Sequence, residues 1–178
     1  KMYRHLANQN PILPSVAGTS ASEALGYVRE TEFGANEFLF MNLMDVHGPY
    51  NPPLRYQRCR YSRTDIMPKG METFSDDPAD PEATRDAYDD CARYLSDKLR
   101  AIVDELNDFD YVITLSDHGE SFGEDGVWGH VYGLHPSLTH VPLVIRGPDR
   151  TTSTQEAPVD LLDVYATILD IAGISTET

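Results

Sequence analysis

The chain alternates short apolar runs with longer amphipathic segments. Runs of apolar residues predict strands at 37–44, 111–115 and 141–145. Apolar positions at helical spacing predict helices over 23–30, 81–106 and 160–172. Strands that alternate with helices in this way favour an α/β fold, with a layered sheet and flanking helices.

Residues at the segment boundaries refine this prediction. Asp80 and Pro81 suit the N-cap and first turn of the long helix, and Ser22 is expected to cap the helix from Glu23. Gly173 fits a C-terminal stop for the last helix. The nearly continuous apolar runs at 37–44 and 111–115 are expected to be buried strands, the first covered on both faces.

Polar residues follow two of the predicted strands directly. The run Ser116-Asp117-His118-Gly119-Glu120 comes after 111–115, and ligands bind at the carboxyl ends of strands in open α/β sheets. Asp117 and His118 can offer oxygen and nitrogen to one divalent cation, before a glycine that we expect to be flexible. The strand at 37–44 ends in a proline-rich, rigid loop that carries Asp45 and His47.

A third polar loop, 129–140, carries three further histidines. His130 and His135 lie within it, whereas His140 adjoins a strand and is expected to be structural. Trp128 either lines a pocket or packs in the interior. Together, the three loops indicate a site for a cation and a tetrahedral oxyanion such as sulfate or phosphate.

Composition limits the classes of partner. A chain of 178 residues fits one domain, and its 29 acidic and 14 basic residues give a net charge of -15. Such a surface repels nucleic acid and anionic membranes, and no apolar run reaches the roughly 18 residues that span a bilayer. Cys59 and Cys91 do not make a disulfide framework, so a cytoplasmic location is expected, with Cys91 in the core.

Five segments in order resemble the sulfatases of the alkaline phosphatase superfamily. They are 38–53 with its His-Gly-Pro-Tyr loop, 88–97, the Ser-Asp-His-Gly-Glu segment 116–126, the His-Val-Pro-Leu segment 140–145, and 160–173. The resemblance covers 36–175, and residues 1–35 carry none of these motifs. It implies an alkaline-phosphatase-like fold for a sulfatase-like catalytic domain over 1–178.

The resemblance also implies roles for individual residues. Asp117 and His118 correspond to metal ligands, and His47 corresponds to a histidine that contacts the sulfate group. His130 corresponds to the cation that faces the ester oxygen or leaving group, with His135 as the competing candidate. One divalent metal ion is therefore expected, Ca2+ first and Mg2+, Mn2+ or Zn2+ as alternatives, together with a small sulfated substrate.

Two features of sulfatases are missing from the chain. These enzymes have a pair of aspartate metal ligands near the start, then Cys- or Ser-Xaa-Pro-Xaa-Arg, whose first residue becomes the formylglycine nucleophile. Cys59-Arg60-Tyr61 has no proline at the third position and lies in the wrong order. The chain is therefore expected to be an incomplete, C-terminal portion of the catalytic domain, with no nucleophile and negligible activity alone.

Three other interpretations stay open at this point. Phosphate or phosphonate monoester hydrolases and phosphotransferases of the same superfamily share the Asp-His-Gly and late histidine motifs, and a bare threonine nucleophile would distinguish them. A non-catalytic acidic scaffold domain and an ordinary α/β domain with surface histidines are the others. The sequence names neither the ester nor the oligomeric state.

The acidic surface with only three lysines also predicts adaptation to high salt. Counterions at 1 M salt screen repulsion beyond about 3 Å, so molar KCl should raise the melting temperature. Thermal unfolding across a KCl series measures this, and a melting temperature that does not respond to molar KCl would contradict the prediction.

Overall fold

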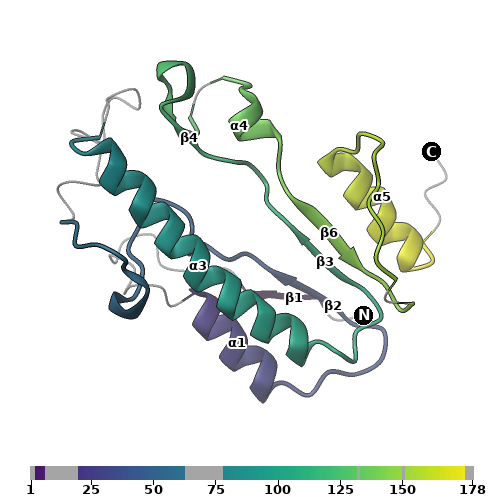
Figure 1. Ribbon diagram of the computed structural model, residues 1–178. Helices are drawn as coiled ribbons and strands as arrows, with labels where there is room; N and C mark the ends of the chain where they lie inside the picture. The colour runs from purple at the N-terminus through teal and green to yellow at the C-terminus, as the bar shows by residue number, and fades with distance from the viewer. Residues whose placement is uncertain (1–2, 7–19, 63–77, 132, 150, 175–178) are drawn as a thin grey trace.

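The computed structural model describes residues 3–6, 20–62, 78–131, 133–149 and 151–174. Residues 63–77 lie outside this description. In chain order the elements are β1 (Tyr3–Leu6), α1 (Ser20–Glu30), β2 (Phe38–Met41), the 3-10 turn η1 (Leu54–Tyr56), α3 (Pro81–Glu105), β3 (Val112–Leu115), β4 (Ser121–Phe122), η2 (Glu124–Gly126), β5 (Trp128–Gly129), α4 (Pro136–Thr139), β6 (Leu143–Arg146) and α5 (Leu161–Ile171) (Figure 1).

The strands of the described residues pair two by two. β1 runs parallel to β2, whereas β3 pairs with β6 and β4 with β5 in antiparallel fashion. Strand β1 was not predicted from the sequence. The mixture of helices and strands agrees with the α/β prediction, and one continuous layered sheet stays a prediction.

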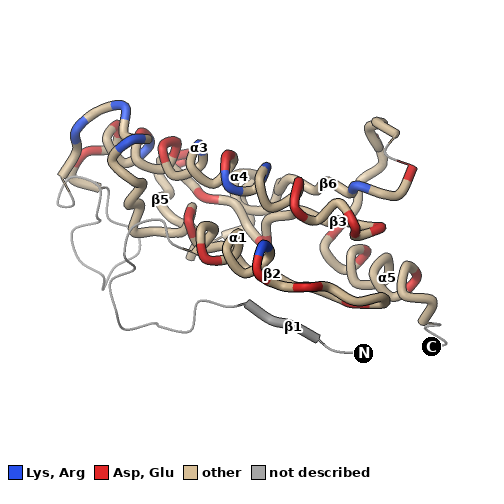
Figure 2. Tube along the Cα trace, turned by 90° about the horizontal axis from the view of Figure 1, so that it is seen from below, with Lys and Arg blue, Asp and Glu red and all other residues tan. Residues whose placement is uncertain are grey.

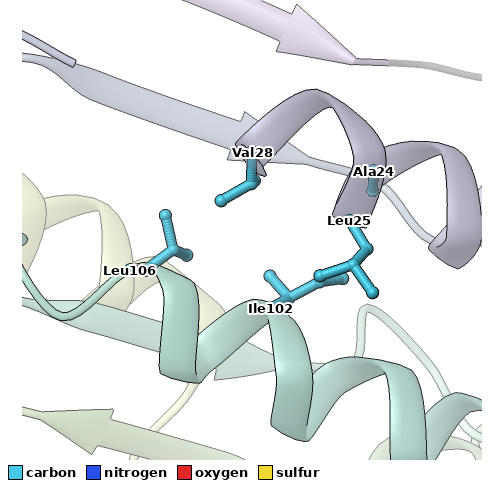
Figure 3. Close-up of a cluster of buried hydrophobic side chains, with 5 residues drawn as sticks. All are labelled: Ala24, Leu25, Val28, Ile102 and Leu106. Atoms are coloured by element: carbon cyan, nitrogen blue, oxygen red, sulfur yellow. The ribbon is translucent and has the colours of Figure 1, made fainter. Parts of the chain in front are cut away.

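Helices α1 and α3 lie side by side and bury the main apolar cluster between them (Figures 1 and 3). The cluster joins one face of α1 to the C-terminal part of α3 through Ala24, Leu25, Val28, Ile102 and Leu106. Side chains of β2 and β3 pack against the same cluster. Leu39 and Met41 come from β2, and Val112 comes from β3. The helix pair therefore covers one face of β2 and reaches β3.

The opposite face of β2 is not covered as predicted. Phe38 and Phe40 are 40% and 50% exposed, because alternate residues of a strand point to opposite faces and only Leu39 and Met41 meet the helices. The prediction of a strand covered on both faces is therefore wrong for the described residues. The prediction that 111–115 forms a buried strand is also wrong, because Leu115 is 39% exposed.

The predicted N-cap of α3 and the predicted C-terminal stop of α5 are confirmed, and α5 also has an N-cap that was not predicted. Asp80 accepts hydrogen bonds from the backbone N–H groups of Glu82 and Ala83 at 3.1 and 3.0 Å. Asp160 forms a capping box with Asp163 at the start of α5. Gly173 follows α5 with a φ of 65°, a left-handed conformation that glycine adopts without strain.

Helix α1 begins earlier than predicted. It starts at Ser20, and Ser22 lies in the first turn with its hydroxyl 2.6 Å from that of Tyr94. A residue distant in sequence caps the helix instead, since Asp45 accepts from the Ala21 N–H at 3.0 Å and from the Ser20 hydroxyl. The distant Asp45 carboxylate therefore takes the capping role that the sequence predicted for the local Ser22.

The segment after β2 is fixed to α3 by an ion pair. Asp90 of α3 is fully buried, and it accepts from the Arg58 backbone N–H at 3.0 Å and from the Arg58 Nε at 2.7 Å. The hydrogen bond to Asp90 raises the pKa of the Arg58 guanidinium, so the guanidinium stays charged. Cys91, next to Asp90, is buried as predicted.

Acidic residues occupy α1, α3 and α5 (Figure 2). Within the part of the chain that the structure describes, no helix combines the length and apolar character that crossing a bilayer requires.

The C-terminal end of α3 is held by a strand residue. Arg146 of β6 donates from Nη1 to the Val103 carbonyl at 3.1 Å and from Nη2 to the Leu106 carbonyl at 2.6 Å. Carbonyls in the last turn of a helix lack intrahelical partners, and a cation at this position also complements the helix dipole. The Leu106 carbonyl also accepts the Phe109 N–H at 3.1 Å. Arg146 therefore joins the β3–β6 pair to the helix layer.

Replacing this arginine should destabilise the fold. Arg146→Met keeps the aliphatic stem and removes the donors, so the free energy of unfolding in urea should fall by about 2 kcal/mol. Arg29→Met is the matched control, because its ion pair with Glu105 is exposed and worth at most about 1 kcal/mol. Equal losses for the two variants would contradict the assignment.

Candidate active site

Three histidines from separate segments come together. His47 lies in the loop after β2, His118 follows β3, and His130 follows β5. The rings of His118 and His130 stack with centroids 4.4 Å apart, and the rings of His47 and His130 meet edge to face at 5.1 Å. We call these three residues the histidine cluster.

Backbone carbonyls orient two of the rings. The Nδ1 of His47 lies 2.7 Å from the Gly48 carbonyl oxygen, and the Nδ1 of His118 lies 2.8 Å from that of Gly119. A carbonyl oxygen has no proton, so each Nδ1 must be the donor. The Nε2 of each ring is then the atom left to bind a ligand or a proton.

The third ring is oriented by a buried carboxylate. The Glu120 side chain is 8% exposed, and the Nδ1 of His130 lies 3.0 and 3.1 Å from its two oxygens. The hydroxyl of Tyr50 donates to the same carboxylate at 2.8 Å. Glu120 therefore joins the loop of His47 to the segment of His130.

Tyr50 is held firmly in place. It packs against Tyr88 with ring centroids 5.4 Å apart and belongs to a buried cluster with Ala87 and Cys91 of α3. Burial, and then the charge of Glu120, raise the pKa of the Tyr50 hydroxyl far above its ordinary value. The hydroxyl thus remains protonated and stays a donor to Glu120.

Glu120 and Tyr50 are not among the site residues predicted from the sequence. Both lie inside quoted motifs, since Tyr50 is three residues after His47 and Glu120 is three residues after Asp117. Their contact spans seventy positions of the chain. Each of the two loops, which were expected to meet, carries one of these polar residues. This was the signal that the sequence offered for their contact.

Gly119 is required by close packing, which corrects the expectation of a flexible glycine. A Cβ at this position would lie 2.0 Å from the Ser137 carbonyl oxygen. The Gly119 N–H donates to the Leu138 carbonyl at 2.8 Å, and the hydroxyls of Ser121 and Ser137 lie 2.6 Å apart. Helix α4 is therefore packed directly against the segment that carries His118 and Glu120.

Trp128 packs against the β4–β5 hairpin. The guanidinium of Arg85 lies over its ring, 5.1 Å from the centroid, and also donates to the Phe122 carbonyl. A Cβ on Gly123 would come within 3.1 Å of the ring. This tryptophan and α3 together hold the hairpin that precedes His130.

Asp117 and His118 lie next to each other at the edge of the cluster. The Asp117 side chain is 79% exposed, and its Oδ1 accepts the His118 backbone N–H at 3.1 Å. The Asp117 carboxylate and the His118 Nε2 are thus two donors suited to a divalent cation. Two donors supply only part of a coordination sphere, and no group of three or more His, Cys, Asp or Glu among the described residues is arranged to hold a metal ion.

The remaining candidate histidines lie in other contacts. The Nδ1 of His135 is 3.4 Å from Oδ2 of Asp125, and the ring contacts of the histidine cluster do not include it. The side chain of His140 is exposed. A pocket of about 330 Å³ is lined by Leu54, Gln57, Arg58, Cys59 and Arg60, so its walls contain none of the candidate site residues.

The chemistry of the cluster suits a small anion. The protonated imidazoles of His47 and His130 can donate hydrogen bonds and positive charge to a tetrahedral oxyanion, whereas Asp117 and His118 can hold a cation and Glu120 can orient a ring. The candidate ligands and candidate anion-binding residues therefore share one region of the molecule.

Comparison with known proteins agrees with this chemistry. A sequence model of the family named Sulfatase matches residues 18–174. The choline-sulfatase of Rhizobium meliloti (strain 1021) is 35% identical over 139 residues, which are 75% of this chain and 25% of that protein. A sulfatase of Formosa agariphila is 31% identical over 94 residues, 49% of this chain and 18% of that protein. Arylsulfatase K of Bos taurus is 42% identical over 64 residues, 35% of this chain and 12% of that protein.

The chain spans a quarter or less of the length of these relatives. The match nevertheless extends over most of its own residues, including every segment that forms the histidine cluster. The chain therefore belongs to the sulfatase family of the alkaline phosphatase superfamily, which has an α/β fold and whose members are sulfate ester hydrolases.

Proposed function

We propose that this chain is part of the catalytic domain of a metal-dependent sulfatase that hydrolyses a small sulfate monoester. The observation that carries the proposal is the histidine cluster, in which His47, His118 and His130 meet beside Asp117. Such a group of donors suits the charge of a sulfate group and of its transition state.

Each residue of the cluster has a proposed role. In its imidazolium form, His47 donates to a sulfate oxygen through Nε2, since its Nδ1–H is already donated to the Gly48 carbonyl. His130 faces the ester oxygen through Nε2, because Glu120 holds its Nδ1. His135 remains the competing candidate for that role.

Asp117 and His118 are proposed to hold a divalent cation, with Ca2+ favoured because carboxylate oxygen suits hard cations. When bound, such a cation supplies charge that stabilises the sulfate oxygens. Ca2+ takes six to eight oxygen ligands, so two donors from this chain leave most positions to other groups.

The remaining ligands and the nucleophile are proposed to come from other parts of the protein. The choline-sulfatase relative is about four times as long as the segment it shares with this chain, which leaves room for both. For the same reason, the 178 residues alone should have negligible sulfatase activity.

Activity is tested with the full protein that contains this chain. It should hydrolyse 4-nitrophenyl sulfate or choline sulfate, and His47→Ala should lower kcat/KM by about 100-fold, as expected for loss of a positioned donor. Turnover is followed by release of nitrophenolate or inorganic sulfate, for the full protein and for the 178-residue chain. Faster hydrolysis of the matching phosphate ester would favour the phosphohydrolase interpretation, and full activity of the chain alone would refute its dependence on other segments.

Metal dependence is tested by titration calorimetry with Ca2+, Mg2+ and Mn2+ after chelation. Asp117→Ala should weaken binding at least about 10-fold, because it removes a charged ligand. Asp104→Ala is the control, since it removes an exposed carboxylate of α3. Identical isotherms for the wild-type and Asp117→Ala proteins would exclude the proposed site.

A further inference from the structure

Glu120 is the one buried carboxylate that contacts the histidine cluster among the described residues, and the proposed function assigns it no chemical step. A carboxylate that is only 8% exposed must be satisfied by donors, because an unpaired buried charge is strongly unfavourable. Its donors are Tyr50, at 2.8 Å, and His130, at 3.0 and 3.1 Å.

These contacts determine which ring nitrogen of His130 is available to a ligand. An ionised carboxylate only accepts hydrogen bonds, so the Nδ1 of His130 carries a proton that points at Glu120. The Nε2 then points away from the carboxylate, and the ring plane is held by stacking on His118 at 4.4 Å. A histidine held between a carboxylate and a stacked ring has little freedom to turn.

Tyr50 in turn restrains the carboxylate. Its ring is buried between Tyr88 and the Phe122 side chain, and its hydroxyl donates to Oε2. Because Tyr50 lies in the loop of His47, the same contact also sets the distance between that loop and His130. The hydroxyl, carboxylate and imidazole thus form one chain of hydrogen bonds across two loops.

We propose that Glu120 and Tyr50 are positioning residues for His130: through their chain of hydrogen bonds they hold its ring with Nε2 directed to the substrate. The proposal rests on the proposed function for its kinetic part. Its structural part, the protonation of Nδ1 and the ring orientation, is independent of which ester is cleaved.

The kinetic test uses the full protein and a sulfate ester. Glu120→Gln keeps the volume and one acceptor but removes the charge, so kcat should fall by about 10- to 100-fold with little change in KM. Tyr50→Phe should lower kcat by a smaller factor. Glu124→Gln is the matched control, because its carboxylate contacts the Phe122 backbone N–H, and it should leave kcat unchanged.

Chemical rescue separates positioning from a purely structural role. Glu120→Ala opens a space beside His130, and added formate should restore a substantial part of the lost kcat, whereas formate should not affect Glu120→Gln. A loss of kcat that formate does not restore, with a lowered melting temperature, would overturn the proposal. So would an unchanged kcat in Glu120→Gln.

A spectroscopic readout keeps this inference distinct from the proposed function. In protein labelled with 15N-histidine, with His130 assigned by its loss in His130→Gln, the wild type should show the proton on Nδ1. Glu120→Ala should shift His130 toward the Nε2-protonated tautomer. If the wild-type protein cleaves no sulfate ester, the proposed function fails, but the tautomer of His130 still decides the role of Glu120. An Nε2-protonated His130 in the wild type would overturn the positioning role of Glu120.

Discussion

The arrangement of the site depends on one buried acceptor. The carboxylate of Glu120 receives Tyr50 from the loop after β2 and His130 from the segment after β5. These two segments have no strand pairing with each other among the described residues, so side-chain contacts must bring them together. Tyr50 also packs against Tyr88 of α3 and Phe122 of the β4–β5 hairpin. This packing stabilises the contact between the two segments. Burial strengthens each hydrogen bond because water does not compete for the carboxylate.

Local sequence signals predicted the elements that depend on local forces. The cap at Asp80 and the stop at Gly173 followed from residue type and position, since the neighbouring backbone groups are their partners. The placement of β2, β3 and β6 also followed from apolar runs, although β2 and β6 are shorter than the runs that indicated them, whereas β1, β4 and β5 were not predicted. The motif order pointed to the family, and the loops that carry His47, His118 and His130 do meet.

Errors arose where distant residues decide the outcome. The start of α1 depends on Asp45, which lies more than twenty positions away, so a local serine was a misleading signal. The exposure of Phe38 and Phe40 depends on which layers cover β2, and an apolar run carries no information on that. Glu120 was overlooked because its two partners lie in other segments, and neither spacing nor composition pairs them.

The contact between Gly119 and α4 has a consequence for how this region tolerates change. Any side chain at position 119 would collide with the Ser137 carbonyl, so it would push the short helix outward together with the serine pair behind it. The His118 backbone would move in the same displacement, because it adjoins the glycine. Substitutions in α4 are therefore expected to shift the edge where Asp117 and His118 lie, and a redesign of this loop has to change the glycine and the helix together.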